Sequence, residues 1–198
     1  MLGLLGGVAA IGAASEAPIT LAPAMAAHLE MHGVGVGWIT SAFGLGGMLG
    51  VVAHRVCSRV LQPRSEGCAA MLLFGVSLAL AGVGSQLWLV TIALLIAGAG
   101  MVQGITAFSL AVQSRSPSAM LGRIMALWVL AFAGVRPISS LAIGFVADHH
   151  SVRVAMLGAG LFSAIATAAV LFTTKAKRDS AESAPLTRSG RAPNRMVS

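Results

Sequence analysis

Residues 87–112 read LWLVTIALLIAGAGMVQGITAFSLAV, a run of 26 residues that contains no charged side chain. A bilayer has a hydrocarbon core about 30 Å thick, and a helix needs roughly 20 apolar residues to cross it. Further apolar stretches of similar length lie at about 2–27, 35–54, 68–86, 124–147 and 152–174. The sequence therefore predicts an all-α integral membrane protein, with six transmembrane helices packed as one bundle over residues 1–174 and the lipid bilayer as its surroundings.

The composition excludes an ordinary soluble domain. The chain of 198 residues is 57% hydrophobic and 10% charged, whereas a soluble domain carries about 25% charged residues. The net charge of +7 would suggest nucleic acid as the partner of a soluble protein. Here the Lys and Arg residues gather in the connections and the tail, so we expect no nucleic-acid partner.

The positions of the basic residues predict the orientation. The second and fourth connections and the tail together hold 11 of the 13 Lys and Arg residues, which are Arg55, Arg59, Arg64, Arg115, Arg123, Lys175, Lys177, Arg178, Arg188, Arg191 and Arg195. Loops rich in Lys and Arg stay in the cytoplasm. We therefore expect a multi-pass protein of the cell membrane (inner or plasma) with both termini in the cytoplasm, and we interpret residues 175–198 as a disordered, basic cytoplasmic tail.

Glycines and prolines mark where the helices pack and bend. Pro18 and Pro23 interrupt the first segment, which a membrane helix tolerates when neighbours satisfy the freed carbonyl groups. Small residues four positions apart allow two helix backbones to approach closely. Because glycines are concentrated in the second, fourth and fifth segments, we expect packing roles for Gly46, Gly50, Gly100, Gly104, Gly134 and Gly144.

A weak internal repeat relates the two halves of the bundle. Gly50-Val-Val-Ala-His-Arg55 resembles Gly144-Phe-Val-Ala-Asp-His149, at an offset of 94 residues. Each copy ends the second helix of a group of three, and an odd number of spans separates them. They would therefore face opposite sides of the membrane, as an inverted 3+3 repeat predicts.

Three stretches resemble the major facilitator superfamily, in the branch that contains the enterobactin exporter and the transmembrane secretion effectors. Gly44-Leu-Gly-Gly-Met-Leu-Gly50 resembles the glycine-rich eighth helix, and Leu121-Gly-Arg-Ile-Met-Ala-Leu-Trp128 resembles the R-G-R-V-M-S-L-Y loop before the eleventh. Gly134-Val-Arg-Pro-Ile-Ser-Ser-Leu-Ala-Ile-Gly144 resembles the eleventh helix. The resemblance covers about residues 1–173 and implies the C-terminal six-helix half of a twelve-helix fold.

The resemblance implies a secondary active transporter, a proton-coupled exporter of small organic molecules that works by alternating access. A chain that begins at the seventh helix of the family would be a fragment. It would need the missing N-terminal six-helix half, or a second copy, as a partner, with the second and fifth segments facing that partner. The alternatives are a non-transporting membrane scaffold or accessory protein, or a nonfunctional truncated product.

The family's cytoplasmic loop motif reads roughly G-x-x-x-D-R-x-G-R-R. Gly50, Arg55 and Arg59 keep their places in this motif, whereas His54 replaces the Asp and Cys57 the Gly. Arg123 belongs to the second loop motif.

By the same resemblance, the first and fourth segments line the transport path, which makes Glu16, Gln103 and Thr106 candidates. Glu16 is the one acid that we expect well inside a span, and it could couple protons, pair with Arg136 or sit in a wet cavity mouth. Gln103 and Thr106 could bind substrate or join helices. Arg136 is costly in lipid, by roughly 2.5–3.5 kcal/mol, so it should face protein or water. It could contact a substrate or pin the structure beside Pro137.

No catalytic pattern accompanies these residues. The sequence contains no H-E-x-x-H, no P-loop and no nucleophile–base arrangement, so we expect neither an enzyme nor a cofactor. His28, Glu30 and His32 form H-x-E-x-H. Since this spacing is not that of a closed zinc site, we interpret them as loop residues and expect no metal.

Overall fold

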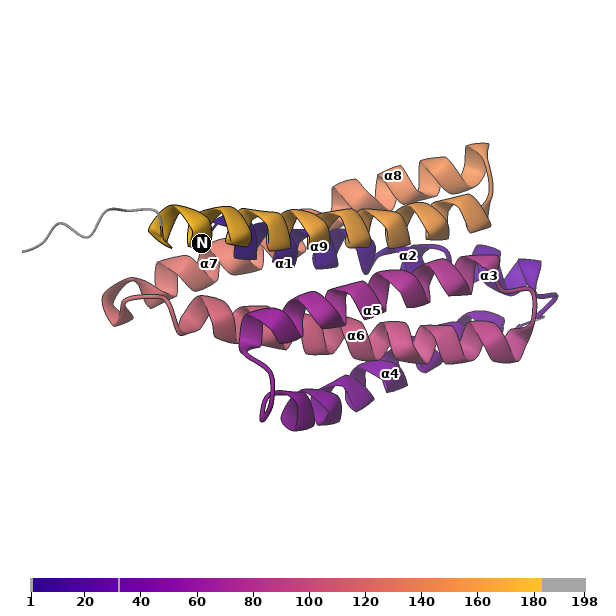
Figure 1. Ribbon diagram of the computed structural model, residues 1–198. Helices are drawn as coiled ribbons and strands as arrows, with labels where there is room; N and C mark the ends of the chain where they lie inside the picture. The colour runs from indigo at the N-terminus through magenta and orange to yellow at the C-terminus, as the bar shows by residue number, and fades with distance from the viewer. Residues whose placement is uncertain (1, 32, 183–198) are drawn as a thin grey trace, which may run out of the picture.

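The computed structural model describes residues 2–31 and 33–182, and this part of the chain is helical throughout apart from its connections. Its elements are α1 (Leu2–Ala14), α2 (Ala17–Thr20), α3 (Ala22–His28), α4 (Gly35–Cys57), α5 (Pro63–Val83), α6 (Leu87–Gln113), a 3₁₀ turn (Ser118–Met120), α7 (Leu121–Ala133), α8 (Arg136–His149) and α9 (Val152–Glu182). The long helices run side by side along the bundle (Figure 1). The prediction of an all-α membrane bundle is confirmed.

Within residues 2–31 and 33–182, five segments are long and apolar enough to cross a bilayer, and a sixth is formed when the bent pair Leu5–Thr20 and Ala22–His28 is taken as one span. The bend in that pair is 45°, and it lies between the two prolines of the first segment. Pro18 and Pro23 each sit in the first turn of a new helix, where a missing N–H costs least. The prolines therefore divide the first predicted span into three helical pieces.

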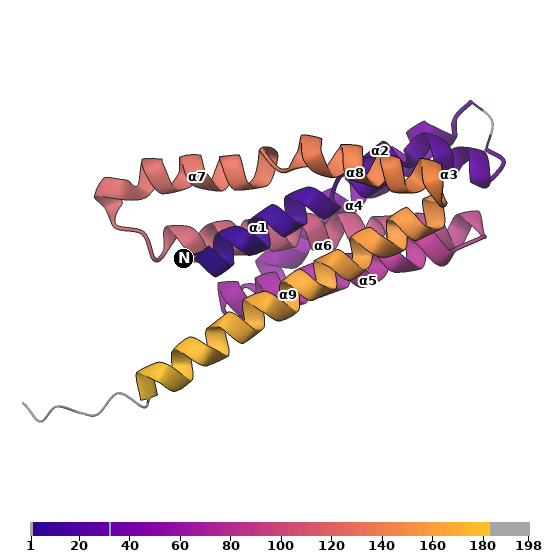
Figure 2. The ribbon, with the colours of Figure 1, turned by 90° about the horizontal axis from the view of Figure 1, so that it is seen from above.

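The fifth span is also divided. It breaks between α7 and α8 at Gly134 and Val135, because Pro137 cannot continue a helix from the preceding turn and instead sits in the first turn of α8. Figure 2 shows α7 and α8 following one another along one side of the bundle, with α9 slanting away from α7. The two broken spans, α1–α3 and α7–α8, pack against each other through α1 with α7 and α8, and α2 with α8.

α6 lies at the centre of the bundle and packs against α4, α5 and α1, while α5 packs against both α6 and α9. Two clusters of buried apolar side chains fill the space between these helices. One includes Leu78 and Leu94, and the other includes Met71 and Phe108. In contrast, no residue of α7 or α8 is buried.

Two boundaries differ from those predicted. α5 begins at Pro63 rather than at about residue 68, so Arg64 and Glu66 lie inside this helix and not in the connection before it. α9 continues past residue 174 as far as Glu182. The rest of the predicted disordered tail, residues 183–198, lies outside the described residues.

Candidate functional site

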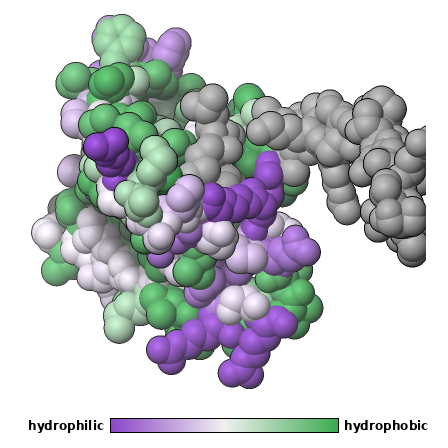
Figure 3. Space-filling model, turned by 90° about the vertical axis from the view of Figure 1, so that its left-hand side faces the viewer, coloured by the Kyte–Doolittle hydropathy of each residue, from purple (hydrophilic) through white to green (hydrophobic). Residues whose placement is uncertain are grey.

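The ends of the bundle differ in polarity. One end holds the α4–α5 and α6–α7 connections, and its arginines include Arg55, Arg59, Arg115 and Arg123, all with exposed side chains. We call it the basic end. Figure 3 looks at this end and shows hydrophilic side chains gathered there, beside green apolar surface. The structure thus places the three arginines of the loop motifs, Arg55, Arg59 and Arg123, at the surface.

An ion pair joins the two broken spans. Arg136 is the first residue of α8, and its Nε donates a hydrogen bond to Oε1 of Glu16, the N-cap residue of α2. The side chain of Glu16 is 12% exposed and that of Arg136 is 38% exposed. Each charge therefore has an opposite charge as its partner, and the guanidinium group remains partly exposed at the surface of the bundle.

Aromatic side chains support the arginine. The guanidinium carbon of Arg136 lies 5.6 Å from the ring centroid of Phe132, and Phe132 stacks on Trp128 with 5.7 Å between centroids. A cation over an aromatic face gains about 0.5–1 kcal/mol at an exposed site. These rings hold the guanidinium group on the side of α7, where it faces Glu16.

Close contact between α1 and α7 makes the pairing possible. The backbone carbonyl of Phe132 lies so near Gly12 that a β-carbon at this position would overlap with it. One turn later, Ser15 uses its hydroxyl to cap the Gly12 carbonyl at 2.8 Å, where α1 ends. Because α1 ends there, Glu16 projects at the break between α1 and α2, next to the corresponding break between α7 and α8.

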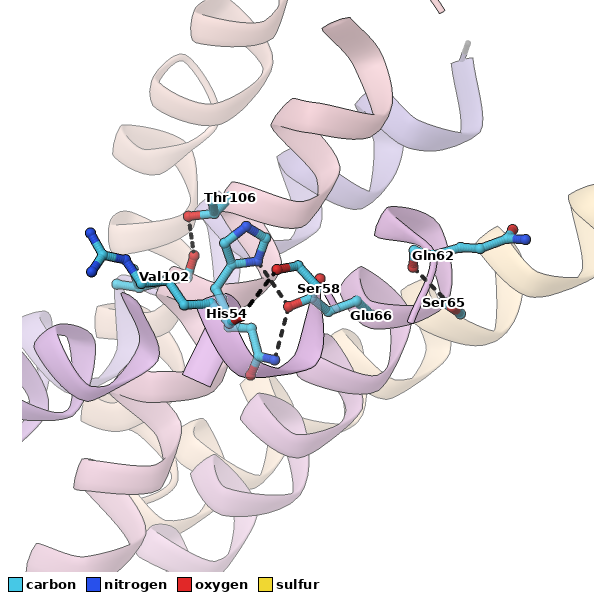
Figure 4. Close-up of polar contacts among 9 residues, drawn as sticks. His54, Ser58, Gln62, Ser65, Glu66, Val102 and Thr106 are labelled. Carbon is cyan, nitrogen blue, oxygen red and sulfur yellow. Dashed lines mark hydrogen bonds and ion pairs between the residues drawn. The ribbon is translucent and has the colours of Figure 1, made fainter. Parts of the chain in front are cut away.

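A second polar cluster lies towards the basic end, between α4, α5 and α6 (Figure 4). Nδ1 of His54 is 2.8 Å from Oε1 of Glu66, and Nε2 of Gln103 donates to the same oxygen at 3.1 Å. Glu66 is 1% exposed, and the side chain of His54 is 14% exposed. The other carboxylate oxygen of Glu66, Oε2, is buried and has no hydrogen-bond partner among the described residues.

Glycines bring the three backbones together around this cluster. Gly50, one turn before His54, lies against the carbonyl of Ala99 on α6, and Gly46 lies against that of Leu95. A β-carbon at Gly100 would stand 2.8 Å from the carbonyl oxygen of Ala70 on α5. These contacts leave no space for a side chain, so they set the distance across which Glu66 meets its partners.

The candidate residues on α6 make different contacts. Gln103 points to Glu66, so it joins helices rather than lining an open path. Thr106 bonds the carbonyl of Val102 in its own helix at 2.8 Å. A β-carbon at Gly104 would meet Ile11 of α1 at 3.1 Å.

Two glycines of the fifth span make no helix contact of the expected kind. Gly134 is crowded by Leu130 of the preceding turn of α7, and Gly144 has open space around it. Both lie in a span that has no buried residue, and therefore no neighbouring helix approaches them closely within the described bundle.

Sequence reasoning missed Glu66, because Glu16 was expected to be the one acid well inside a span. Glu66 is buried in the first turn of α5, in a stretch that was expected to belong to the connection before this span. A signal was available. Proline at the start of a helix, followed by an acid within the first turn, is typical of a helix N-terminus, and Pro63 and Glu66 fit this pattern.

Of the H-x-E-x-H residues, His32 lies outside the described residues.

A family model described as transmembrane secretion effector matches residues 4–197. No curated protein and no solved structure matches the chain.

Proposed function

The chain belongs to the transmembrane secretion effector family, a branch of the major facilitator superfamily of membrane transporters, and from this premise we propose that it is one six-helix half of a secondary active transporter. The proposed activity is proton-coupled export of small organic molecules by alternating access. In such a mechanism two bundles rock about a site near the middle of the membrane. We propose no catalytic reaction for the chain.

The observation that carries this proposal is the ion pair between Glu16 and Arg136. Both residues lie where a span is broken, and discontinuous helices are the usual place for substrate and ion sites in transporters. An arginine and a carboxylate inside a membrane are costly, which makes them functional candidates. Their partial exposure supports a position on the wall of a path, where the ion pair can meet an organic substrate.

The distribution of charge supports the orientation. We propose that the basic end faces the cytoplasm of the cell, because loops rich in Lys and Arg remain on that side. The start of α1 and the end of α9 both lie towards this end (Figure 1), so both termini would be cytoplasmic. This assignment places the His54–Glu66 pair near the cytoplasmic surface and the Glu16–Arg136 pair deeper in the membrane.

We further propose that α4, α7 and α8 face a second six-helix bundle, either an N-terminal half or another copy of this chain. α7 and α8 have no buried residue, and α4 exposes Met48, Val52 and Val56. Alternating access needs two bundles around one site. A single bundle would leave the Glu16–Arg136 pair on an open surface.

Dye efflux from cells tests the transport proposal. A host that lacks its own multidrug exporters is loaded with ethidium, a cationic dye, or fluorescein, an anionic dye, and expresses the chain with its partner. Efflux of either dye above the level of the empty host is expected. Glu16→Gln and Arg136→Gln should remove most of this efflux, whereas Asp148→Asn, a change at an exposed position, should preserve it.

The double substitution Glu16→Arg with Arg136→Glu adds a sharper test, because it restores the ion pair in reverse. If the ion pair only stabilises the fold, the double variant should recover dye efflux. A protein in which Glu16 and Arg136 line the transport path should assemble and still fail to export dye. Membranes in which wild type and all variants give no efflux of either dye would favour a non-transporting scaffold or a nonfunctional product.

Cysteine crosslinking tests the pairing of two bundles. A single cysteine at Val52, in a chain whose Cys57 and Cys68 are replaced, should form a covalent link to a second six-helix bundle in the native membrane. The same cysteine at Val76, an exposed position on α5, should remain unlinked. Labelling of both positions by a lipid-soluble thiol reagent, with no crosslink at either, would contradict the proposed contact.

A further inference from the structure

The His54–Glu66–Gln103 cluster, described above as a contact between three helices, has an arrangement that packing alone does not require. Glu66 is 1% exposed and keeps one carboxylate oxygen buried without a partner. A buried polar atom without a hydrogen bond is costly, and a buried ionised one is more so. An apolar residue would join the helices without this cost, so the presence of a carboxylate calls for another role.

We propose that the His54–Glu66–Gln103 cluster is a proton-binding site at the basic end and holds the proton that drives transport. The inference rests on the proposed transport function. It assigns the coupling proton to Glu66, with His54 as the relay from water, and leaves Glu16 and Arg136 to line the substrate path.

The geometry provides a route for the proton. The side chain of His54 is 14% exposed whereas Glu66 is 1% exposed, so the imidazole ring is accessible from the surface of the bundle and the carboxylate is not. A proton taken up at Nε2 of a neutral His54 that carries its hydrogen on Nδ1 gives an imidazolium ion. Transfer of the Nδ1 hydrogen across the 2.8 Å contact then leaves a neutral imidazole and a neutral carboxylic acid, which together have gained one proton.

Among the side chains that the structure describes, His54 is the ion-pair partner of Glu66. α6 and residues 2–14 of α1 carry no charged residue, and residues 152–171 of α9 carry only Arg153, at the opposite end of the bundle. On α5 itself, Nη2 of Arg64 donates to the carbonyl of Val170 on α9 at 3.0 Å. Arg55 on α4 is exposed. His54 is therefore the titratable side chain that faces the carboxylate, and Gln103 is a neutral donor to it.

Protonation would change the contact between helices. As a carboxylate, Glu66 accepts two hydrogen bonds at Oε1, from α4 and from α6, and bonds to an ionised group are about twice as strong as neutral ones. Once Glu66 is neutral, both bonds weaken. α4 is then held at the basic end mainly by its glycine contacts, and this is the end that must open and close when a bundle rocks.

Infrared difference spectroscopy of the full chain with its partner, in lipid, reads the proton directly. A protonated carboxyl group has a C=O band of its own, which should grow as the pH is lowered. Glu66→Gln should remove one band, while Glu16→Gln and Asp148→Asn should leave that band in place. Gln103→Leu should keep the band and move its frequency, because a donor to the carboxyl group is lost.

A pH jump separates the relay from a structural role. In His54→Gln the neighbour of Glu66 can still donate a hydrogen bond but cannot carry a proton. Growth of the Glu66 band after the jump should then slow by about tenfold or more, in keeping with the effect of removing a positioned proton carrier. An unchanged rate would overturn the relay.

The same samples distinguish this inference from the proposed function. Dye efflux with no pH-dependent band that Glu66→Gln removes would overturn the proton site and leave the transporter standing. A Glu66 band that titrates in a protein that exports neither dye would refute the transport function, and with it the coupling role, while the site would still bind a proton.

Discussion

Nδ1 of His54 lies 2.8 Å from Oε1 of Glu66 and joins the last turn of α4 to the first turn of α5 across their connection. Removing one partner of a buried pair typically costs about 3–5 kcal/mol, whereas replacing both by apolar residues is often neutral. We therefore expect His54→Leu to lower the free energy of unfolding by about 3 kcal/mol, and the double change with Glu66→Met to recover most of this. Reversible unfolding in mixed detergent micelles measures both. Arg55→Ala, at an exposed neighbouring position, should change the free energy of unfolding by less than about 0.5 kcal/mol. Equal losses in the single and double variants would contradict the ion pair.

Gly50→Ala tests the contact between α4 and α6. The added methyl group would overlap with the carbonyl of Ala99, and overpacking of a tight contact costs about 1–3 kcal/mol. Gly44 lies on the same helix with open space around it, so Gly44→Ala should be neutral or slightly stabilising, as alanine favours helix over glycine by up to about 1 kcal/mol. Thermal unfolding in detergent compares the two, and a similar melting temperature for both would argue against the close approach.

Gly12→Ala should act on the Glu16–Arg136 pair from a distance. The methyl group would meet the carbonyl of Phe132 and push α7 away from α1, so the pair would lengthen. We expect both lower stability and reduced dye efflux. Gly6, also on α1, has no neighbour within 4 Å, and Gly6→Ala serves as the control. If Gly12→Ala lowered stability but left efflux at the wild-type rate, the pair would not depend on this contact.

Gln103 and Thr106 lie one turn apart on α6 but should respond differently. Nε2 of Gln103 donates to Glu66, and a hydrogen bond to a charged group contributes about 1.5–3 kcal/mol, so Gln103→Leu should lower the unfolding free energy by that order. Thr106 bonds its own helix, and Thr106→Val should have little effect. Chemical unfolding measures both, and a larger loss for Thr106→Val would contradict these assignments.

The sequence predicted much of this structure because long apolar runs and broken helices are local features. Residues 87–112 alone indicate a membrane span, and Pro18, Pro23 and Pro137 indicate where the first and fifth spans break. Pairing of Glu16 with Arg136 could also be considered in advance, because few charges were available inside the spans.

What the sequence did not reveal depends on contacts between distant positions. Gly12 matters because of the Phe132 carbonyl on another helix, which no local pattern indicates. Glu66 was assigned to a connection because apolar composition begins at about residue 68, although the helix begins earlier, at Pro63. Gly144 shows the opposite error. The sequence predicted a packing role for this glycine, but a β-carbon there would meet no atom within 4 Å.

The most direct test of transport uses the purified chain with its partner in sealed vesicles under an imposed pH gradient. We predict that ethidium or fluorescein moves across the membrane only when the gradient is present, that protons move in the opposite direction, and that Glu16→Gln stops the dye. Dye movement equal to that of empty vesicles, from a protein that has assembled with its partner, would contradict the account.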